Sequence, residues 1–111
     1  MDIDFLFVRG DTFSFTFELE DFTGNLDTCF FSCKENVEDE TYAFQKSLGD
    51  GIEKVSDNQY RVKLEREDTI NMIVGLPYFH DVEIGINGDF LTIISGKLKL
   101  KQDITRNIEG E

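Results

Sequence analysis

Apolar and polar residues alternate without a break between Thr12 and Glu20, where the chain reads Thr-Phe-Ser-Phe-Thr-Phe-Glu-Leu-Glu. Three phenylalanines and a leucine occupy every second position of this stretch. Because successive side chains of a strand point to opposite faces, all four fall on one face of a strand, whereas a helix would scatter them around its circumference. The spacing therefore predicts a half-buried β-strand that needs other strands to cover it.

Six further short segments have strand-like composition or alternation, and turn residues separate them. They are Asp2 to Val8, Thr28 to Lys34, Tyr42 to Ser47, Tyr60 to Glu65, Tyr78 to Ile86 and Phe90 to Lys101. Between them we expect a turn at Leu48 to Ile52, a single helical turn at Glu67 to Met72, and a two-residue hairpin turn at Asn87-Gly88. Seven short strands at this spacing predict an all-β, antiparallel β-sandwich, with a small barrel as the alternative.

The phase of each predicted strand selects the residues that should form the core. We predict that it contains Phe13, Phe15, Phe17, Leu19, Phe31, Phe44, Tyr60, Val62, Leu64, Tyr78, Val82, Ile84, Ile94 and Leu98. A chain of 111 residues is expected to form one domain, residues 1–111, with a core that needs no metal or disulfide. The polar stretch 103–111 is expected to be a frayed tail, and we see neither a signal peptide nor an apolar run long enough to span a membrane.

The formal net charge of −12 narrows the classes of partner. Nucleic-acid binding needs clustered Lys and Arg against phosphates, so we expect no nucleic-acid partner and no anionic membrane surface. The charge is typical of a protein that resists non-specific association or that binds a basic partner.

The two cysteines, Cys29 and Cys33, lie on the same face of one predicted strand. Their Cα atoms would be about 13 Å apart, which is too far for a disulfide. We therefore predict two free, buried thiols and synthesis in a reducing cytoplasm. Only His80 could join them as a third ligand, so we predict no zinc site.

Few residues suggest chemistry. Arg9-Gly10-Asp11 matches a short adhesion motif but is predicted to be a turn. Acidic clusters occur at Asp2 and Asp4, at 35–40 and at 50–53; a solvated surface is the expected interpretation and calcium the alternative, since no calcium-loop spacing is present. His80 is predicted to point inward beside Val82. We find no nucleophile motif and no phosphate-binding loop, and we predict a protein that is not an enzyme and has no cofactor and no metal.

Several short motifs, in order, carry a family resemblance. They are Arg9-Gly10-Asp11-Thr12, Phe44-Gln45-Lys46-Ser47-Leu48-Gly49-Asp50-Gly51-Ile52, Tyr60-Arg61-Val62, Glu67-Asp68-Thr69, Tyr78, Asp81-Val82-Glu83-Ile84, Gly96 and Asp103-Ile104-Thr105. Together they resemble small structural proteins encoded in the tail-module regions of phages and prophages of Gram-positive bacteria. The chain is also similar to the amino-terminal domain of phage baseplate upper proteins.

The resemblance implies an immunoglobulin-like sandwich and a non-enzymatic role in a virion tail or baseplate. Its partners would be other virion proteins; whether copies of the chain also associate with one another is left open, and the net charge already argues against nucleic acid and membrane. The family supplies no catalytic residues. Cys29, Cys33 and His80 depart from it, since aliphatic or small residues and an aromatic ring are usual at these places.

Two hypotheses for binding follow from the predicted strands. The first is that Asp2 to Val8 forms an edge strand through which a partner docks, with Phe5 and Phe7 as the partner-binding residues. The second is a carbohydrate-binding module, which would use a row of exposed aromatic rings. Phe79 and Phe22 are the two rings predicted to be exposed, and the chain has no Trp.

Overall fold

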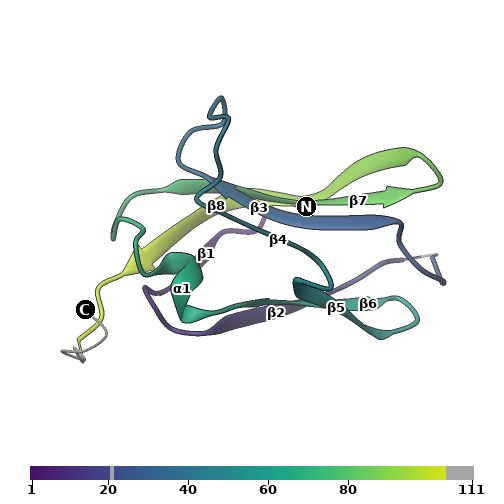
Figure 1. The fold of residues 1–111 in the computed structure, drawn as a ribbon, viewed down its shortest axis with the longest axis horizontal. Coiled ribbons are helices and arrows are strands. Elements are labelled where there is room, and N and C mark those ends of the chain that lie inside the picture. The colour runs from purple at the N-terminus through teal and green to yellow at the C-terminus, as the bar shows by residue number, and fades with distance from the viewer. Residues whose placement is uncertain (21, 105–111) are drawn as a thin grey trace.

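In a computed structural model, which describes residues 1–20 and 22–104, the chain forms two packed layers of β-strands. The strands are β1 (Phe5–Val8), β2 (Phe13–Glu18), β3 (Thr28–Lys34), β4 (Phe44–Leu48), β5 (Gly51–Ser56), β6 (Gln59–Leu64), β7 (Tyr78–Ile86) and β8 (Asp89–Lys101), and one short helix, α1 (Arg66–Thr69), precedes β7. Figure 1 shows β3, β7 and β8 in one layer and β2, β5 and β6 in the other. The all-β prediction is confirmed.

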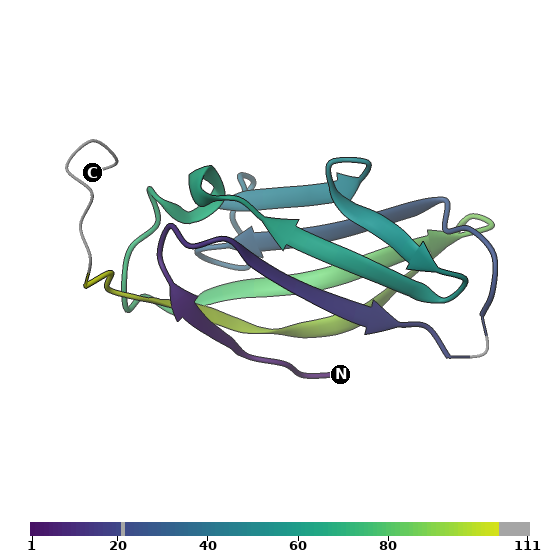
Figure 2. The same cartoon turned by 90° about the horizontal axis from the view of Figure 1, so that it is seen from below.

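Hydrogen bonding runs through the strands in the order β1-β8-β7-β3-β4-β5-β6-β2. β4 links the layers, because it pairs with β3 on one side and with β5 on the other. The order β2-β6-β5 in one layer and β3-β7-β8 in the other is that of the B, E, D and C, F, G strands of an immunoglobulin-like sandwich. Since β1 and β2 stand at the two ends of the order, the sheet is nearly but not fully closed into a barrel (Figure 2, the two purple strands).

Two details differ from the predicted antiparallel sandwich of about seven strands. There are eight strands, and β1 with β8 and β4 with β5 are parallel pairs. The additional strand is β5, which begins within the stretch predicted to be only a turn. β4 begins at Phe44 rather than at Tyr42, and Tyr42 lies outside the strand with 47% of its surface exposed.

The predicted core is largely confirmed, and twelve of its fourteen residues are buried. Phe13 and Phe15 are exceptions: they pack against the core but are only half-buried, because β2 is an end strand with no hydrogen-bonded neighbour beyond it. Four apolar residues outside the prediction are also buried, namely Leu26, Ile52, Met72 and Leu100. The two thiols are free and buried as predicted.

The turns follow from residues that accept a left-handed backbone. Asn87 and Gly88 have φ of 52° and 85°, which confirms the predicted hairpin turn between β7 and β8. Gly10 has φ of 83° in the turn between β1 and β2, where the Asp11 N–H donates to the Val8 carbonyl over 3.2 Å. The Arg-Gly-Asp tripeptide is therefore turn structure in this fold.

Helix α1 is shorter than the helical turn predicted at Glu67 to Met72, and a capping box holds its amino-terminal end. The Asp68 carboxylate accepts the Glu65 N–H over 2.7 Å, and it also pairs with Lys46 of β4 over 2.9 Å. Both members of this ion pair are mostly shielded from solvent. The helix thereby closes one end of the sandwich (Figure 1).

Tyr78 fixes the loop between α1 and β7. Its hydroxyl oxygen accepts the Ile73 N–H over 2.8 Å, while its ring is buried. A tyrosine at the start of the F strand that bonds a backbone group a few residues upstream is the tyrosine corner of immunoglobulin-like sandwiches.

We expect Tyr78→Phe to lower the free energy of unfolding by about 1 kcal/mol, because the Ile73 N–H loses its acceptor while the buried ring is kept. Urea titration would measure this loss. Tyr42→Phe is the matched control, since Tyr42 is exposed and its hydroxyl makes no hydrogen bond among residues 1–20 and 22–104. Equal stability of both variants would show that the Tyr78 hydroxyl contributes nothing.

Candidate functional site

β1, the strand proposed as a docking edge, stands at one end of the strand order and begins at Phe5. The rings of its two phenylalanines point inward. Phe7 stacks on Phe13 with 4.2 Å between ring centroids, and Phe5 lies 4.9 Å from Phe15. These rings join β1 to β2 across the open side of the barrel. Partner binding by Phe5 and Phe7 stays a prediction, and it would have to use the strand's backbone edge rather than these rings.

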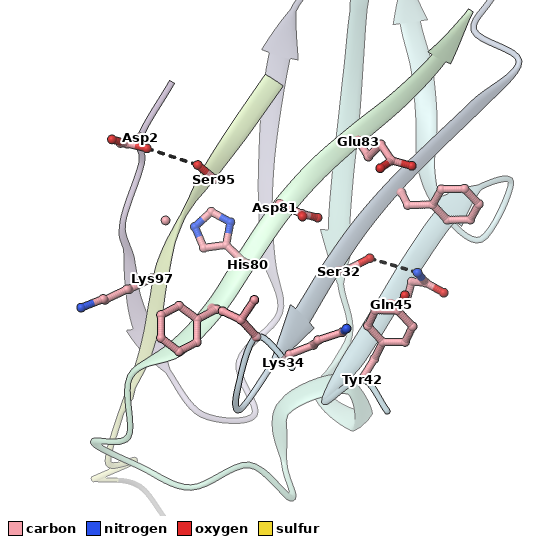
Figure 3. A pocket seen from close by; sticks show the side chains of 14 residues that line it. Asp2, Ser32, Lys34, Tyr42, Gln45, His80, Asp81, Glu83, Ser95 and Lys97 are labelled. Atoms are coloured by element: carbon pink, nitrogen blue, oxygen red, sulfur yellow. Dashed lines mark hydrogen bonds between the residues drawn. The ribbon is translucent and has the colours of Figure 1, made fainter. Parts of the chain in front are cut away.

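The outward face of β3, β7 and β8 is hollowed into a groove of about 690 Å³, shown in Figure 3, which we call the outer groove. Its lining comes from these strands, from β4, from the segment before β4 and from the amino-terminal segment. The lining residues are Asp2, Phe30, Ser32, Lys34, Val37, Tyr42, Gln45, Phe79, His80, Asp81, Glu83, Ser95, Gly96 and Lys97.

A polar row crosses the middle of the outer groove. The strand register places Gln45, Ser32, Asp81 and Ser95 side by side on β4, β3, β7 and β8. Gln45 Nε2 donates to Ser32 Oγ over 3.0 Å, and Ser95 Oγ donates to Asp2 Oδ1 over 3.2 Å (Figure 3). The row thus has hydrogen-bonded ends, and Asp81 lies between them.

Aromatic rings flank this row on both sides. Phe30 lies opposite Glu83 in the register, and Phe79 lies opposite Lys34. Along β7, Glu83 follows Asp81 by two residues and Phe79 precedes it by two. Phe79 is 37% exposed and Tyr42 is 47% exposed. Lys34 Nζ lies 5.0 Å from the centroid of the Tyr42 ring, a cation–π contact at the end of the groove.

Asp81 is the most unusual charged group of the outer groove. Burial raises the pKa of its carboxyl group, and electrostatic interactions with His80 and, more weakly, with Lys34 lower it by less. Within the described residues, 1–20 and 22–104, the Asp81 carboxylate makes no hydrogen bond and no ion pair. A partly desolvated carboxylate without a partner in a groove is typical of binding sites.

His80 forms the inner side of the groove, as predicted from its inward phase, and is 4% exposed. Its Nε2 lies 2.7 Å from the Ile3 carbonyl oxygen, so Nε2 carries the proton and donates it. Nδ1 is buried and has no hydrogen-bond partner in the described part of the chain. The ring packs between Phe5 and Phe31, which gives it a position in the core.

The environment of His80 predicts how stability depends on pH. Burial lowers its pKa below 6.5, and the Ile3 carbonyl and the carboxylates of Asp4 and Asp81 oppose this only in part. The unfolded chain therefore binds a proton below about pH 6.5 that the folded chain rejects. The contribution of neutral His80 to the free energy of unfolding is complete above about pH 6.5, and it is lost as the pH falls toward the lowered pKa of His80.

We expect the free energy of unfolding to fall between pH 6.5 and 5 by at most about 1.4 kcal/mol per pH unit. His80→Phe, which restores an aromatic ring, should remove this dependence. Asp81 has the opposite effect on the pH dependence. Because its pKa is raised in the folded chain, its protonation at low pH stabilises the folded state. Urea unfolding of both proteins at pH 7.5, 6.5 and 5.5 checks the prediction, and parallel losses in the two would contradict it.

The other sequence candidates are not gathered into a site. Among residues 1–20 and 22–104 no group of three or more His, Cys, Asp or Glu side chains is placed to hold a metal ion. Burial raises the pKa of both Cys29 and Cys33 to about 12, so the thiols stay protonated and unreactive. Phe79 is exposed as predicted, whereas Phe22 is partly buried against the core.

The outer groove itself was not identified from the sequence, although one sequence feature could have suggested it. Phe30 and Phe79 occupy the outward phase of β3 and β7, where a one-sided strand normally carries polar residues. Two aromatic residues in this phase on neighbouring strands indicate a functional face.

None of the helices in the described chain is long and apolar enough to cross a membrane.

Comparison with known proteins assigns no family. No family model and no curated protein matches the chain. Among solved structures, the chain is similar to the catalytic module of the multi-modular glycogen-degrading pneumococcal virulence factor SpuA, with 13% identity and a TM-score of 0.49. The match covers 76% of this chain but 11% of that one.

Proposed function

We propose that this chain is a non-enzymatic structural or adaptor protein of a phage or prophage tail or baseplate. It would be synthesised in the bacterial cytoplasm, become part of the virion, and act by contact with other virion proteins. The resemblance of its ordered motifs to tail-module proteins gives the biological setting.

The outer groove is the observation that supports contact through this face. Phe79, Tyr42 and Val37 are 37%, 47% and 64% exposed and line one continuous hollow. Apolar surface gathered in water is unfavourable unless a partner covers it, and such patches mark interaction sites. The carboxylates in its middle and the lysines at one end would orient that partner.

The test is the composition of purified particles. Prophage induction in the organism that encodes the chain should release particles in which mass spectrometry finds it at a fixed ratio to the tail proteins. Its gene should also lie beside tail or baseplate genes. Particles without the chain, from a culture that expresses it, would overturn the proposal.

A carbohydrate-binding module is the second candidate, favoured by one feature of the groove. Exposed rings beside carboxylates and hydroxyls, as at Phe79, Asp81 and Ser95, can stack on a sugar and bond its hydroxyls. A glycan array probed with the protein and with Phe79→Ser tests this. Binding that requires Phe79 would support the carbohydrate function, and an array without hits would remove it.

A further inference from the structure

The outer groove has a charge distribution that selects the chemistry of its partner. We infer that it binds a cationic side chain, an arginine or lysine of a partner protein, with the Asp81 carboxylate as counter-ion. The inference rests on the proposed function and names the chemical group that this contact recognises.

Asp81 lacks the partners that its position offers. Its cross-strand neighbours are Ser32 and Ser95. Ser95 gives its hydroxyl proton to Asp2, and the Ser32 hydroxyl, which accepts a hydrogen bond from Gln45, makes no hydrogen bond to Asp81 within residues 1–20 and 22–104. In the described chain Asp81 is thus left as a carboxylate without an ion pair in a groove that partly excludes water. A carboxylate that is only partly exposed to water gains from an opposite charge that reaches it.

A second carboxylate and two rings complete the site. Glu83 lies two residues further along the same face of β7 and is itself only half-exposed. Phe30 is opposite Glu83, and Phe79 is two residues before Asp81 on the same face. A guanidinium can bond a carboxylate in its plane while its face lies on an aromatic ring, which makes arginine the best fit.

The lysines of the groove form no ion pair with this carboxylate pair among the described residues, although the charge of Lys34 acts on Asp81. Lys34 and Lys97 both lie opposite Phe79 in the register, so they stand at one end of the groove while Glu83 stands toward the other. Lys34 Nζ contacts the Tyr42 ring. The groove is therefore negative in its middle and positive at one end, which would fix the direction of a bound segment.

Charge also favours a cationic protein side chain over a metal ion or a neutral sugar as the ligand of the groove. The net charge of −12 attracts basic partners over long range. Asp81 and Glu83 are not joined by a third metal ligand in the described residues. A neutral sugar would leave the Asp81 charge without a counter-ion.

The experiment is an NMR titration of the isotopically labelled full chain with N-acetyl-arginine methylamide. N-acetyl-citrulline methylamide, nearly the same shape but uncharged, is the matched probe. We expect saturable shifts at Phe30, Phe79, Asp81 and Glu83 with the arginine probe and none with citrulline. Asp81→Asn should lower the affinity for the arginine probe about tenfold, because a hydrogen bond to a charged group is lost. Asp57 is an exposed acid in the β5–β6 turn, and Asp57→Asn should not change this affinity.

Each outcome decides the inference. Equal shifts from both probes, no shifts in the groove, or shifts spread over the acidic surface and unaffected by Asp81→Asn would overturn it. Any of these results together with particles that contain the chain would leave the proposed function intact and show that its contact is not cationic. Glycan binding through Phe79 with no response to arginine would favour the carbohydrate module instead.

Discussion

Replacing Phe31 by alanine is expected to lower the free energy of unfolding by about 3–5 kcal/mol, which is much of the stability of a domain. Phe31 is fully buried. Its ring centroid lies 5.2 Å from that of Phe15 and 5.4 Å from that of Phe44, and it also contacts Phe5 and His80. These neighbours come from both layers, so the cavity cannot close by the movement of one strand. Thermal unfolding should show a midpoint about 10–20 °C lower.

Phe90→Ala is the matched control, because it is the same deletion at a ring that is 65% exposed. We expect its stability to stay within about 0.5 kcal/mol of the native chain. Phe15→Ala should fall between the two, since Phe15 is half-buried although strict alternation predicts it to be core. If Phe31→Ala cost no more than Phe90→Ala, the packing of the two layers around Phe31 would be wrong.

Strands that are covered on one face could be predicted well from the sequence. β3 and β7 have the predicted bounds, and in β7 the residues Tyr78, His80, Val82 and Ile84 are all buried. The alternation is reliable there because one face meets the opposite layer and the other meets the outer groove. The Asn-Gly turn was equally predictable, since two successive residues with positive φ demand these residue types.

Strands without such a contrast could not be predicted. β5 places one buried residue, Ile52, in the core, and the four residues that follow it are exposed, so it has no period to detect. The parallel pairs, β1 with β8 and β4 with β5, could not be predicted either. Alternation indicates which face of a strand is buried, but it carries no information on the direction of the neighbouring strand. Tyr42 was misplaced for a related reason: it has strand-like composition, but it precedes β4 and contacts Lys34 instead of the core.

The outer groove was missed because it depends on strand register rather than on any one segment. Asp81 is unremarkable along the chain, and becomes a candidate only when Ser32 and Ser95 are known to flank it. The exposed ring of Phe79 was identified from the sequence as a binding candidate, but its companions Phe30 and Tyr42 come from other strands and loops. A binding face of this kind is a property of the assembled sheet.

Replacing Gly96 by alanine is expected to lower the free energy of unfolding by about 1–3 kcal/mol, the usual cost of inserting atoms into packed surroundings. A Cβ at this position would overlap the Ile3 carbonyl group, a backbone group that cannot rotate away as a side chain can. Ile3 is held there by its own N–H bond to the Ser95 carbonyl, and its carbonyl accepts the His80 Nε2 proton. The substitution should therefore loosen the amino-terminal segment and leave His80 without its acceptor. Urea unfolding measures the loss, and NMR should show a shift of the His80 ring resonances.

A double-mutant cycle separates this overlap from any other effect of the substitution. Deletion of residues 2–4 joins Met1 directly to Phe5 and removes the Ile3 carbonyl that the new methyl group would meet. If the overlap is the cause, Gly96→Ala in the shortened chain should cost less than half of what it costs in the full chain. The same cost in both would place the effect in the β8 backbone itself.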